Sequence, residues 1–152
     1  MNKLSVYCVH QITGLTYEEV VTYYKDVVLF LTEVGYTVFH PMTGKSYLMN
    51  ATKDNAEGYS APTSTFHAIK ERDQWMVRNS DVIFADLTGC PFVSVGCTSE
   101  IAWGDLLGKH VVVVMEKGNP HDHAFIREMA DIIFDNTADA REYLKKFITQ
   151  EI

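Results

Sequence analysis

The chain has 152 residues, of which 47% are hydrophobic and 22% charged, and its formal net charge at pH 7 is −7. This composition is typical of a globular chain with one core, so we expect residues 1–152 to form a single domain. The negative charge argues against non-specific binding to a nucleic-acid polymer or an anionic membrane, and no apolar run is long enough to span a bilayer.

The cysteines and the N-terminal residues favour a cytoplasmic location. The three cysteines are an odd number, and none of them forms a C-x-x-C pair. Residues 1–3 lead directly into a short apolar run, without the features of a signal peptide. We therefore expect reduced thiols in a cytoplasmic protein.

The first part of the chain predicts a strand, a long helix and a second strand. Thr16, with Glu19 three residues later, matches a helix capping box, and Gly35 matches a helix stop. Between them, apolar residues recur with helical spacing. The predicted elements are the strand 4–9, the helix 17–34 and the strand 36–39.

The segment 42–64 has no clear period and contains glycines and a proline among polar residues. A loop of this length within a compact domain is usually functional or disordered. The segment is therefore either a lid over a site or a surface insertion, and the sequence does not distinguish the two.

The remaining residues alternate between helix and strand. In the first of these helices, Ile69, Trp75 and Met76 are candidate core residues. The strand that follows is nearly all apolar, as is typical of a parallel strand covered on both faces. The predicted elements are the helix 65–79, the strand 81–87, the helix 96–107, the strand 110–115, a short helix ending at 129, the strand 131–134 and the helix 139–150.

This alternation predicts an α/β fold. We expect a three-layer sandwich with a five-stranded, mostly parallel sheet of the flavodoxin or Rossmann type. In such folds, ligands bind at the carboxyl ends of the strands, near a switch in strand order. That rule places the residues after Val9, Phe39, Leu87 and Met115 along one rim.

The run from Val93 to Gly104 carries the strongest functional signal. Gly96 follows a strand-like run, and Glu100 follows four residues later at the start of a helix-like run. Glycine allows a close approach of the backbone to a ligand, and a helix N-terminus presents free N–H groups. A carboxylate there should stay ionised, which suits a nucleophile. The alternative is an ordinary first-turn glutamate, and the local pattern favours neither.

Other polar residues have competing interpretations. Asp73 could work opposite Glu100 in glycosyl transfer, which needs a second group at the leaving base. Its helix pattern alone favours a solvated charge paired with Arg72 or Lys70. The His121-Asp122-His123 run could bind a metal, but two histidines without a third ligand favour turn residues, so we expect no metal and no other cofactor.

Three common catalytic motifs are missing from the sequence. There is no Walker A motif, no G-x-G-x-x-G after the first strand and no G-x-S-x-G elbow. Their absence argues against an NTPase, a dinucleotide oxidoreductase and an α/β-hydrolase.

Several runs, in chain order, together carry a family resemblance. They are Val6-Tyr7, Gln11-Ile12-Thr13-Gly14, Arg72-Asp73, the run from Ser80 to Leu87, the run from Ser94 to Trp103, the run from Gly108 to Met115, and Asn119-Pro120-His121-Asp122-His123. Through them the chain resembles the nucleoside 2-deoxyribosyltransferases and related enzymes that cleave the N-glycosidic bond of nucleoside 5′-monophosphates. The last run is similar to versions common in phage genomes and their hosts.

The resemblance implies roles for individual residues. Glu100 matches the nucleophile that attacks the anomeric carbon and forms a glycosyl-enzyme intermediate. Asp73 matches the acidic residue that assists at the base or sugar. Tyr7 matches a tyrosine of the first strand that lines the site, and Gly96 matches the glycine whose backbone closes around the sugar end.

Further substrate contacts are implied by position. Gln11 and Gly14 belong to the family's first loop, and Asp122 and His123 fall where the family contacts the base. The resemblance also implies a homo-oligomer, a dimer or larger, whose subunits contribute to one another's sites. We expect its interface to involve the helix around Trp103 or Trp75.

One residue departs from the typical deoxyribosyltransferases. They have an aspartate that holds the sugar 5′-hydroxyl where this chain has Ser94, and the monophosphate glycosidases have a serine there. The glycosidases' first-loop arginine is absent, since Thr13 stands in its place. A phosphate would then rely on Ser94, backbone N–H groups and Lys45 or Arg72.

Three functions follow as expectations. The first is an enzyme that transfers the deoxyribosyl group of a 2′-deoxynucleoside to another base. The second is a nucleoside 5′-monophosphate glycosidase that uses water as the acceptor and releases free base. The third is a binding or sensing module without turnover, for which neither Glu100 nor Asp73 would be needed.

Overall fold

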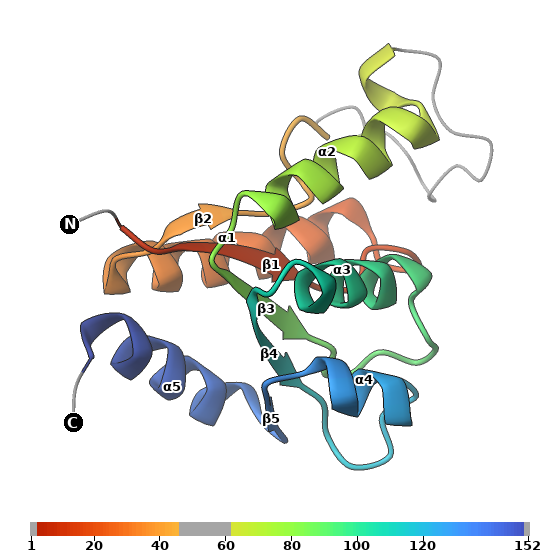
Figure 1. The fold of residues 1–152 in the computed structure, drawn as a ribbon. Coiled ribbons are helices and arrows are strands. Elements are labelled where there is room, and N and C mark those ends of the chain that lie inside the picture. The colour runs from red at the N-terminus through yellow and green to blue at the C-terminus, as the bar shows by residue number, and fades with distance from the viewer. Residues whose placement is uncertain (1–2, 46–61, 151–152) are drawn as a thin grey trace.

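The computed structural model describes residues 3–45 and 62–150, which form one parallel five-stranded sheet with helices on both faces (Figure 1). The strand order is β2-β1-β3-β4-β5, which is the flavodoxin order and confirms the predicted fold class. The strands are β1 (Ser5–Val9), β2 (Thr37–Phe39), β3 (Val82–Asp86), β4 (His110–Val114) and β5 (Ile132–Phe134). The helices are α1 (Tyr17–Val34), η2 (Pro62–Ser64), α2 (Phe66–Arg78), α3 (Val95–Leu106), α4 (Ala124–Met129) and α5 (Thr137–Thr149).

The predicted capping box of α1 is confirmed. Thr16 Oγ1 accepts a hydrogen bond from the Glu19 N–H at 3.2 Å, and Glu19 Oε2 accepts one from the Thr16 N–H at 2.8 Å. These bonds satisfy two N–H groups that the helix would otherwise leave unpaired. Gly35 ends the helix with φ at +115°, a conformation that disfavours residues with a Cβ.

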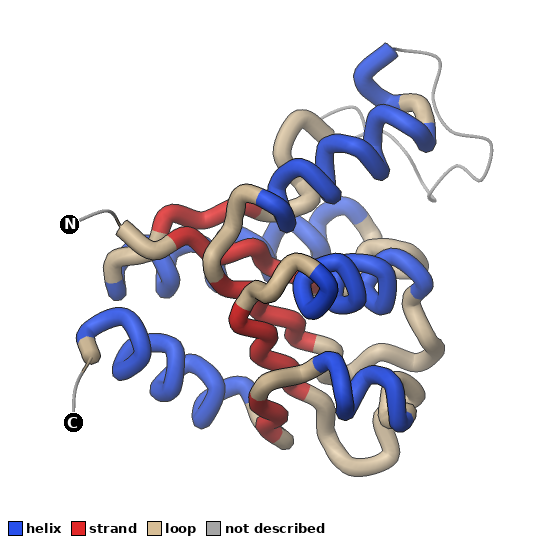
Figure 2. The backbone as a smooth tube through the Cα atoms, viewed as in Figure 1, coloured by secondary structure: helices blue, strands red, loops and turns tan. Residues whose placement is uncertain are grey.

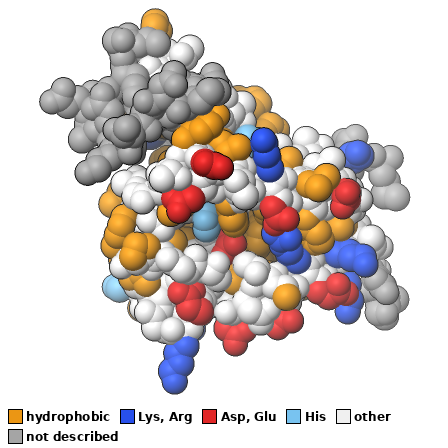
Figure 3. All heavy atoms as spheres, turned by 180° about the vertical axis from the view of Figure 1, so that it is seen from behind, with side chains coloured by type: hydrophobic (Ala, Val, Ile, Leu, Met, Phe, Trp, Pro, Cys, Tyr) orange, Lys and Arg blue, Asp and Glu red, His pale blue; other side chains and the backbone are white. Residues whose placement is uncertain are grey.

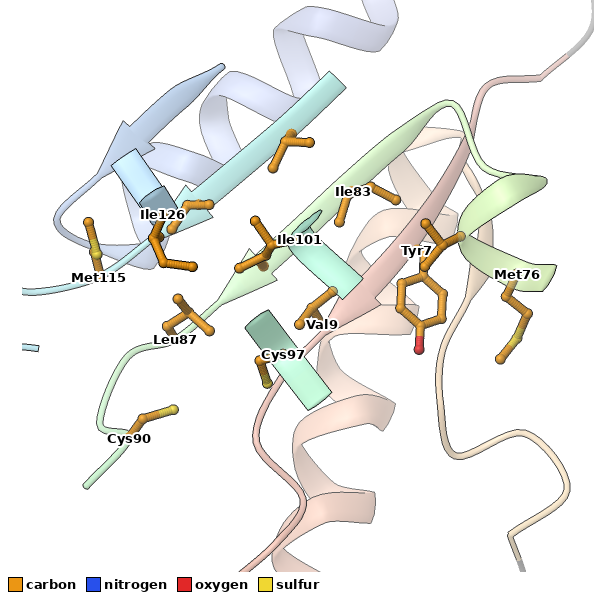
Figure 4. Packing of buried hydrophobic residues seen from close by; sticks show 14 residues of the cluster. Tyr7, Val9, Met76, Ile83, Leu87, Cys90, Cys97, Ile101, Met115 and Ile126 are labelled. Atoms are coloured by element: carbon orange, nitrogen blue, oxygen red, sulfur yellow. The ribbon is translucent and has the colours of Figure 1, made fainter. Parts of the chain in front are cut away.

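Alternation along the strands divides the core into two clusters. Tyr7 and Val9 of β1 and Ile83 of β3 point to the face covered by α2, α3 and α4, as Figure 4 shows for the labelled side chains. Val6 and Phe84 point to the opposite face, which α1 and α5 cover. Figure 2 shows the strands as the middle layer between the helices. The two-residue period of the strands therefore places Tyr7 beneath α3.

The prediction that Trp75 is a core residue is wrong. Met76 is buried and Ile69 is half-buried, but Trp75 is 54% exposed and packs edge-to-face against Phe39 at the margin of the sheet. The buried stripe of α2 consists of Asp73, Met76 and Val77. With helical spacing, Trp75 cannot face inward together with Asp73 and Met76, so it lies outside the buried stripe.

The segment predicted as a lid or insertion lies mostly outside the described residues, since residues 46–61 belong to neither described range. Its last residues form the short helix η2, which leads into α2. Within the described residues, no helix combines the length and apolar character needed to cross a membrane. On the face seen in Figure 3, basic and acidic side chains are scattered among apolar ones.

Gly104 lets α3 lie close to the sheet. A Cβ at this position would stand 2.7 Å from Ile83 Cγ1 and 3.3 Å from Val111 Cγ2. We expect Gly104→Ala to lower the free energy of unfolding by about 1–3 kcal/mol because the helix and the strands must move apart. The matched control is Gly96→Ala in the same helix, where a Cβ meets only Ser94 Oγ at 4.0 Å. Urea unfolding checks both, and equal stability of the two variants would contradict the prediction.

Candidate active site

A cavity of about 400 Å³ lies at the carboxyl ends of the first three strands. Its walls come from the loops that follow β1, β2 and β3 and from the helices α2 and α3. The order reverses between β1 and β3, so the cavity occupies the switch point where ligands bind in such folds. The volume lies within the range of about 300–1,000 Å³ that is common for small-molecule sites.

Glu100 belongs to the buried stripe of α3 and lines this cavity. The stripe consists of Cys97, Glu100, Ile101 and Gly104, which have the spacing of one helix face. Only 7% of Glu100 is exposed. Tyr7, buried at the middle of β1, donates a hydrogen bond from its hydroxyl to Glu100 Oε1 at 2.7 Å. The tyrosine therefore holds one carboxylate oxygen, while the glutamate remains part of the cavity wall.

Asp73 is the second carboxylate of the cavity. It is 8% exposed, and its Oδ2 lies 3.9 Å from Lys45 Nζ in the loop after β2. Within residues 3–45 and 62–150, its Oδ1 is buried without a hydrogen-bond partner. Asp73 is therefore not the solvated helix charge that the local pattern favoured. A buried acceptor that lines a cavity is suited to receive a donor from a ligand.

The environment of Glu100 corrects the expectation that this carboxylate stays ionised. It lies in the second turn of α3, whereas the helix dipole acts mainly within the first turn. Burial, followed by the negative charge of Asp73, raises the pKa of Glu100 to about 8, and the Tyr7 hydrogen bond and Lys45 oppose this rise. Burial also raises the pKa of Asp73, while the positive charges of Lys45 and Arg72 act to lower it. The two carboxylates therefore share a site in which ionising both is costly.

Ser94 and Gly96 form the cavity wall at the start of α3. Ser94 is the N-cap, and its Oγ accepts a hydrogen bond from the Cys97 N–H at 3.3 Å. Its hydroxyl proton can still be donated to a ligand, since this bond uses the oxygen as acceptor. The first N–H groups of a helix favour an anion or a hydroxyl oxygen.

The other predicted site residues lie in different places. Gln11 is buried and donates from Nε2 to the Thr13 carbonyl at 2.8 Å, and Gly14 packs near the Phe92 ring with φ at +88°. Both shape the loop after β1 without being part of the cavity wall. Asp122 forms a salt bridge with Arg127, and His123 caps α4. Within the described part of this one chain, neither residue reaches the cavity.

Sequence reasoning missed His10 as a cavity residue. His10 directly follows β1 and lines the cavity. Its ring stacks on Tyr23 with centroids 3.6 Å apart, and its Nδ1 lies 2.8 Å from the Asp86 carbonyl oxygen. The rule that ligands bind at the ends of parallel strands pointed to this position, but the pattern contained no motif around it. The aromatic residues Phe66 and Phe92 also line the cavity and were missed for the same reason.

Cys97 is a further nucleophile-type side chain of the wall. Burial, together with the charge of Glu100, raises the pKa of the Cys97 thiol to about 12. A thiol of this kind is inert at neutral pH because the thiolate is the reactive form. In residues 3–45 and 62–150, no group of three or more histidine, cysteine or acidic side chains could hold a metal ion. Among the acidic side chains of the described residues, Glu100 and Asp73 line the cavity together.

Comparison with known proteins finds solved structures of the same fold. No family model and no curated protein matches the sequence. The fold is similar to that of the CMP N-glycosidase of Clostridium botulinum, with 19% identity, a TM-score of 0.58, and coverage of 94% of this chain and 98% of that one. It is also similar to the 2-deoxyribosyltransferase of Bacillus psychrosaccharolyticus, with 17% identity, a TM-score of 0.65, and 91% of each chain covered.

A 2-deoxyribosyltransferase from Leishmania mexicana has the same fold, with 16% identity, a TM-score of 0.61, and coverage of 94% of this chain and 97% of that one. At these identities the similarity establishes the fold. The similarity extends over nearly the whole length of each protein.

Proposed function

We propose that the protein is an enzyme that cleaves the N-glycosidic bond of 2′-deoxynucleosides and transfers the deoxyribosyl group to another base. The observation that carries this proposal is the placement of Glu100 and Asp73, both buried, in the wall of one cavity. The solved proteins of this fold that are named as an N-glycosidase and as deoxyribosyltransferases support it. Ionised Glu100 attacks the anomeric carbon, and the electrons of the glycosidic bond leave with the base.

The two carboxylates have different tasks in this reaction. Glu100 is oriented by Tyr7 and traps the oxocarbenium-like sugar as a glycosyl-enzyme intermediate. Asp73 accepts from or donates to the leaving base through its unpaired oxygen. A 2-deoxy sugar lacks the electron-withdrawing 2-hydroxyl, so its transition state is reached more easily. A second base that attacks the intermediate gives transfer, and water gives hydrolysis.

A chromatographic assay tests this function. Deoxynucleosides and deoxynucleoside 5′-monophosphates are each incubated with and without a free acceptor base, beside Glu100→Ala. A new nucleoside that appears only with the acceptor base supports the transferase. The absence of turnover in both sets, with ligand affinity that Glu100→Ala does not change, would identify a binding module and overturn the proposal.

Ser94 favours a second candidate function, a nucleoside 5′-monophosphate glycosidase that releases free base to water. The serine lies in the cavity wall at the N-terminus of α3 and has no charge to repel a phosphate. Lys45 contributes a positive charge to the same cavity. Release of free base from monophosphates without an acceptor would support this candidate over the transferase.

Ser94→Asp is expected to separate the two substrate classes. Aspartate is also a good N-cap, so the helix should form normally. A carboxylate at this position repels a 5′-phosphate, and we expect KM for monophosphates to rise at least about tenfold while KM for nucleosides stays within about threefold. Steady-state kinetics on both substrate sets checks this, with Ser94→Asn as the neutral control. An equal change for both sets would contradict a phosphate role.

We also expect the protein to be a homo-oligomer. Val95 and Leu106 are strongly exposed and lie on the same side of α3, eleven residues apart, and exposed Phe125 lies on the neighbouring helix α4. Exposed apolar side chains gathered on one face mark an interaction surface. Gel filtration at micromolar concentration should give a dimer or larger species, and Leu106→Glu should shift it toward the monomer. A stable monomer of the unchanged protein would contradict this expectation.

A further inference from the structure

His121 is a buried histidine that forms a hydrogen bond with Ser94, a residue of the cavity wall, although His121 does not line the cavity itself. It lies between β4 and α4 and is 1% exposed. Its Nε2 accepts a hydrogen bond from the backbone N–H of Ser94 at 2.8 Å. Since a backbone N–H only donates, Nε2 carries a lone pair. The ring proton is then on Nδ1, which donates to Asn119 Oδ1 at 3.1 Å.

Asn119, the partner of His121, also connects the loop after β4 to the beginning of the loop between β3 and α3. Its Nδ2 donates to the Leu87 carbonyl at 2.7 Å and to Glu116 Oε2 at 3.0 Å. The other oxygen of Glu116 accepts a hydrogen bond from the Gly89 N–H at 3.2 Å. The loop after β4 therefore holds the loop after β3 at its beginning, through Leu87 and Gly89, and at its end, through Ser94.

The end of that loop and the start of α3 form part of the cavity wall. Ser94, Val95 and Gly96 line the cavity, and the side chain of Ser94 caps α3. Because Ser94 N–H is bonded to His121, its orientation depends on an imidazole that touches nothing in the cavity. A rotation of the Ser94 peptide would move both the serine hydroxyl and the following N–H groups.

We propose that His121 is a positioning residue that, in its neutral form, holds Ser94 in the orientation that binds the 5′ end of the substrate's sugar. This inference rests on the proposed function, because it assigns Ser94 to the sugar end of a nucleoside or its monophosphate. His121 acts only through Ser94, since it does not line the cavity.

The surroundings of His121 fit this role better than that of a space-filling core residue. Burying an imidazole is costly unless both nitrogens have partners, and here both do. Burial lowers the pKa of His121, and Glu116 opposes this effect. The lowered pKa favours the neutral ring, which the hydrogen bond from Ser94 requires. A leucine would fill the same space without ordering the peptide of Ser94.

Three variants test the proposal. His121→Gln keeps an uncharged acceptor near the position of Nε2, His121→Leu removes the acceptor, and His67→Gln on the exposed side of α2 is the matched control. Hydrogen exchange of the Ser94 amide reports the bond itself, independently of activity. Calorimetry with 2′-deoxycytidine and its 5′-monophosphate gives Kd, and steady-state assays give KM and kcat.

We expect His121→Leu to lose protection of the Ser94 amide and to raise Kd and KM about 10- to 100-fold, the loss expected for one well-placed hydrogen bond, with kcat within about threefold. His121→Gln should restore protection and affinity to within about threefold, and His67→Gln should change neither. Thermal unfolding shows whether the leucine variant folds. If it does not, His121→Gln still decides the matter, because a glutamine that protects Ser94 without restoring Kd overturns the proposal.

Two results separate this inference from the proposed function. If the unchanged protein binds these ligands without turning them over, the proposed enzyme fails while the Kd values still decide the role of His121. If His121→Leu exposes the Ser94 amide yet binds both ligands as the unchanged protein does, the positioning role is overturned and the enzyme is not.

Discussion

Glu100→Gln is expected to lower turnover at least about 10³-fold, because it removes the group proposed to form the glycosyl-enzyme intermediate. The amide oxygen of glutamine can still accept the Tyr7 hydrogen bond, so the cavity should keep its shape and its affinity for substrate. Single-turnover assays and ligand titration measure the two effects separately. The matched control is Asp105→Asn, an exposed carboxylate of the same helix, which should change neither.

The same substitution is expected to stabilise the folded protein. The pKa of Glu100 is raised from an ordinary value of 4.5 to about 8. The native protein therefore holds a proton that the unfolded chain releases between those values, and stability is lost as pH rises through this window. Glutamine cannot ionise, so its advantage in free energy of unfolding should grow from about 1 kcal/mol at pH 5 to about 4 kcal/mol at pH 8.

Urea unfolding of both proteins at pH 5, 6.5 and 8 measures this trend. Asp105→Asn again serves as the control, because it removes an exposed carboxylate of the same helix. A constant difference between Glu100→Gln and the unchanged protein across the three values would mean that Glu100 does not titrate in this range. Full activity of Glu100→Gln would overturn the proposed mechanism.

Asp73→Asn has the second largest expected effect, and it acts in two ways. Asp73 is proposed to handle the proton of the leaving base, so kcat should fall about 10²- to 10⁴-fold at every pH. Its negative charge also raises the pKa of Glu100, so removing that charge should lower this pKa. Since Glu100 must be ionised to attack, kcat/KM of the unchanged protein should rise with pH up to about 8. In Asp73→Asn, kcat/KM should reach its maximum at a lower pH than in the unchanged protein.

The pH profile of kcat/KM from pH 5 to 9.5 checks both effects. Glu71→Gln is the matched control, because Glu71 is an exposed carboxylate two residues away in the same helix. It should leave both the profile and the rate unchanged. A loss of rate without any displacement of the acidic limb would mean that Asp73 and Glu100 do not interact through charge.

Much of the fold follows from local patterns. The capping residues Thr16 and Glu19 set the start of α1, and the apolar runs of β3 and β4 set two strands buried on both faces. These signals depend on neighbours within a few residues, and every predicted element exists in the structure within a few residues of its expected bounds. The alternation of strand and helix was enough to predict a parallel sheet, because a parallel connection needs a crossover.

These local patterns were sufficient to predict an α/β domain of the flavodoxin or Rossmann type, with Glu100 soon after the end of its third strand. The folded structure was needed to show that Glu100 and Asp73 are buried in the wall of one cavity, that Tyr7 and Lys45 are their partners, and that Trp75 is exposed. It was also needed to show that His121 binds Ser94. The physical reason is that burial, charge coupling and hydrogen bonds between residues far apart in the chain arise from packing. Helical period and capping describe only residues within one turn of each other.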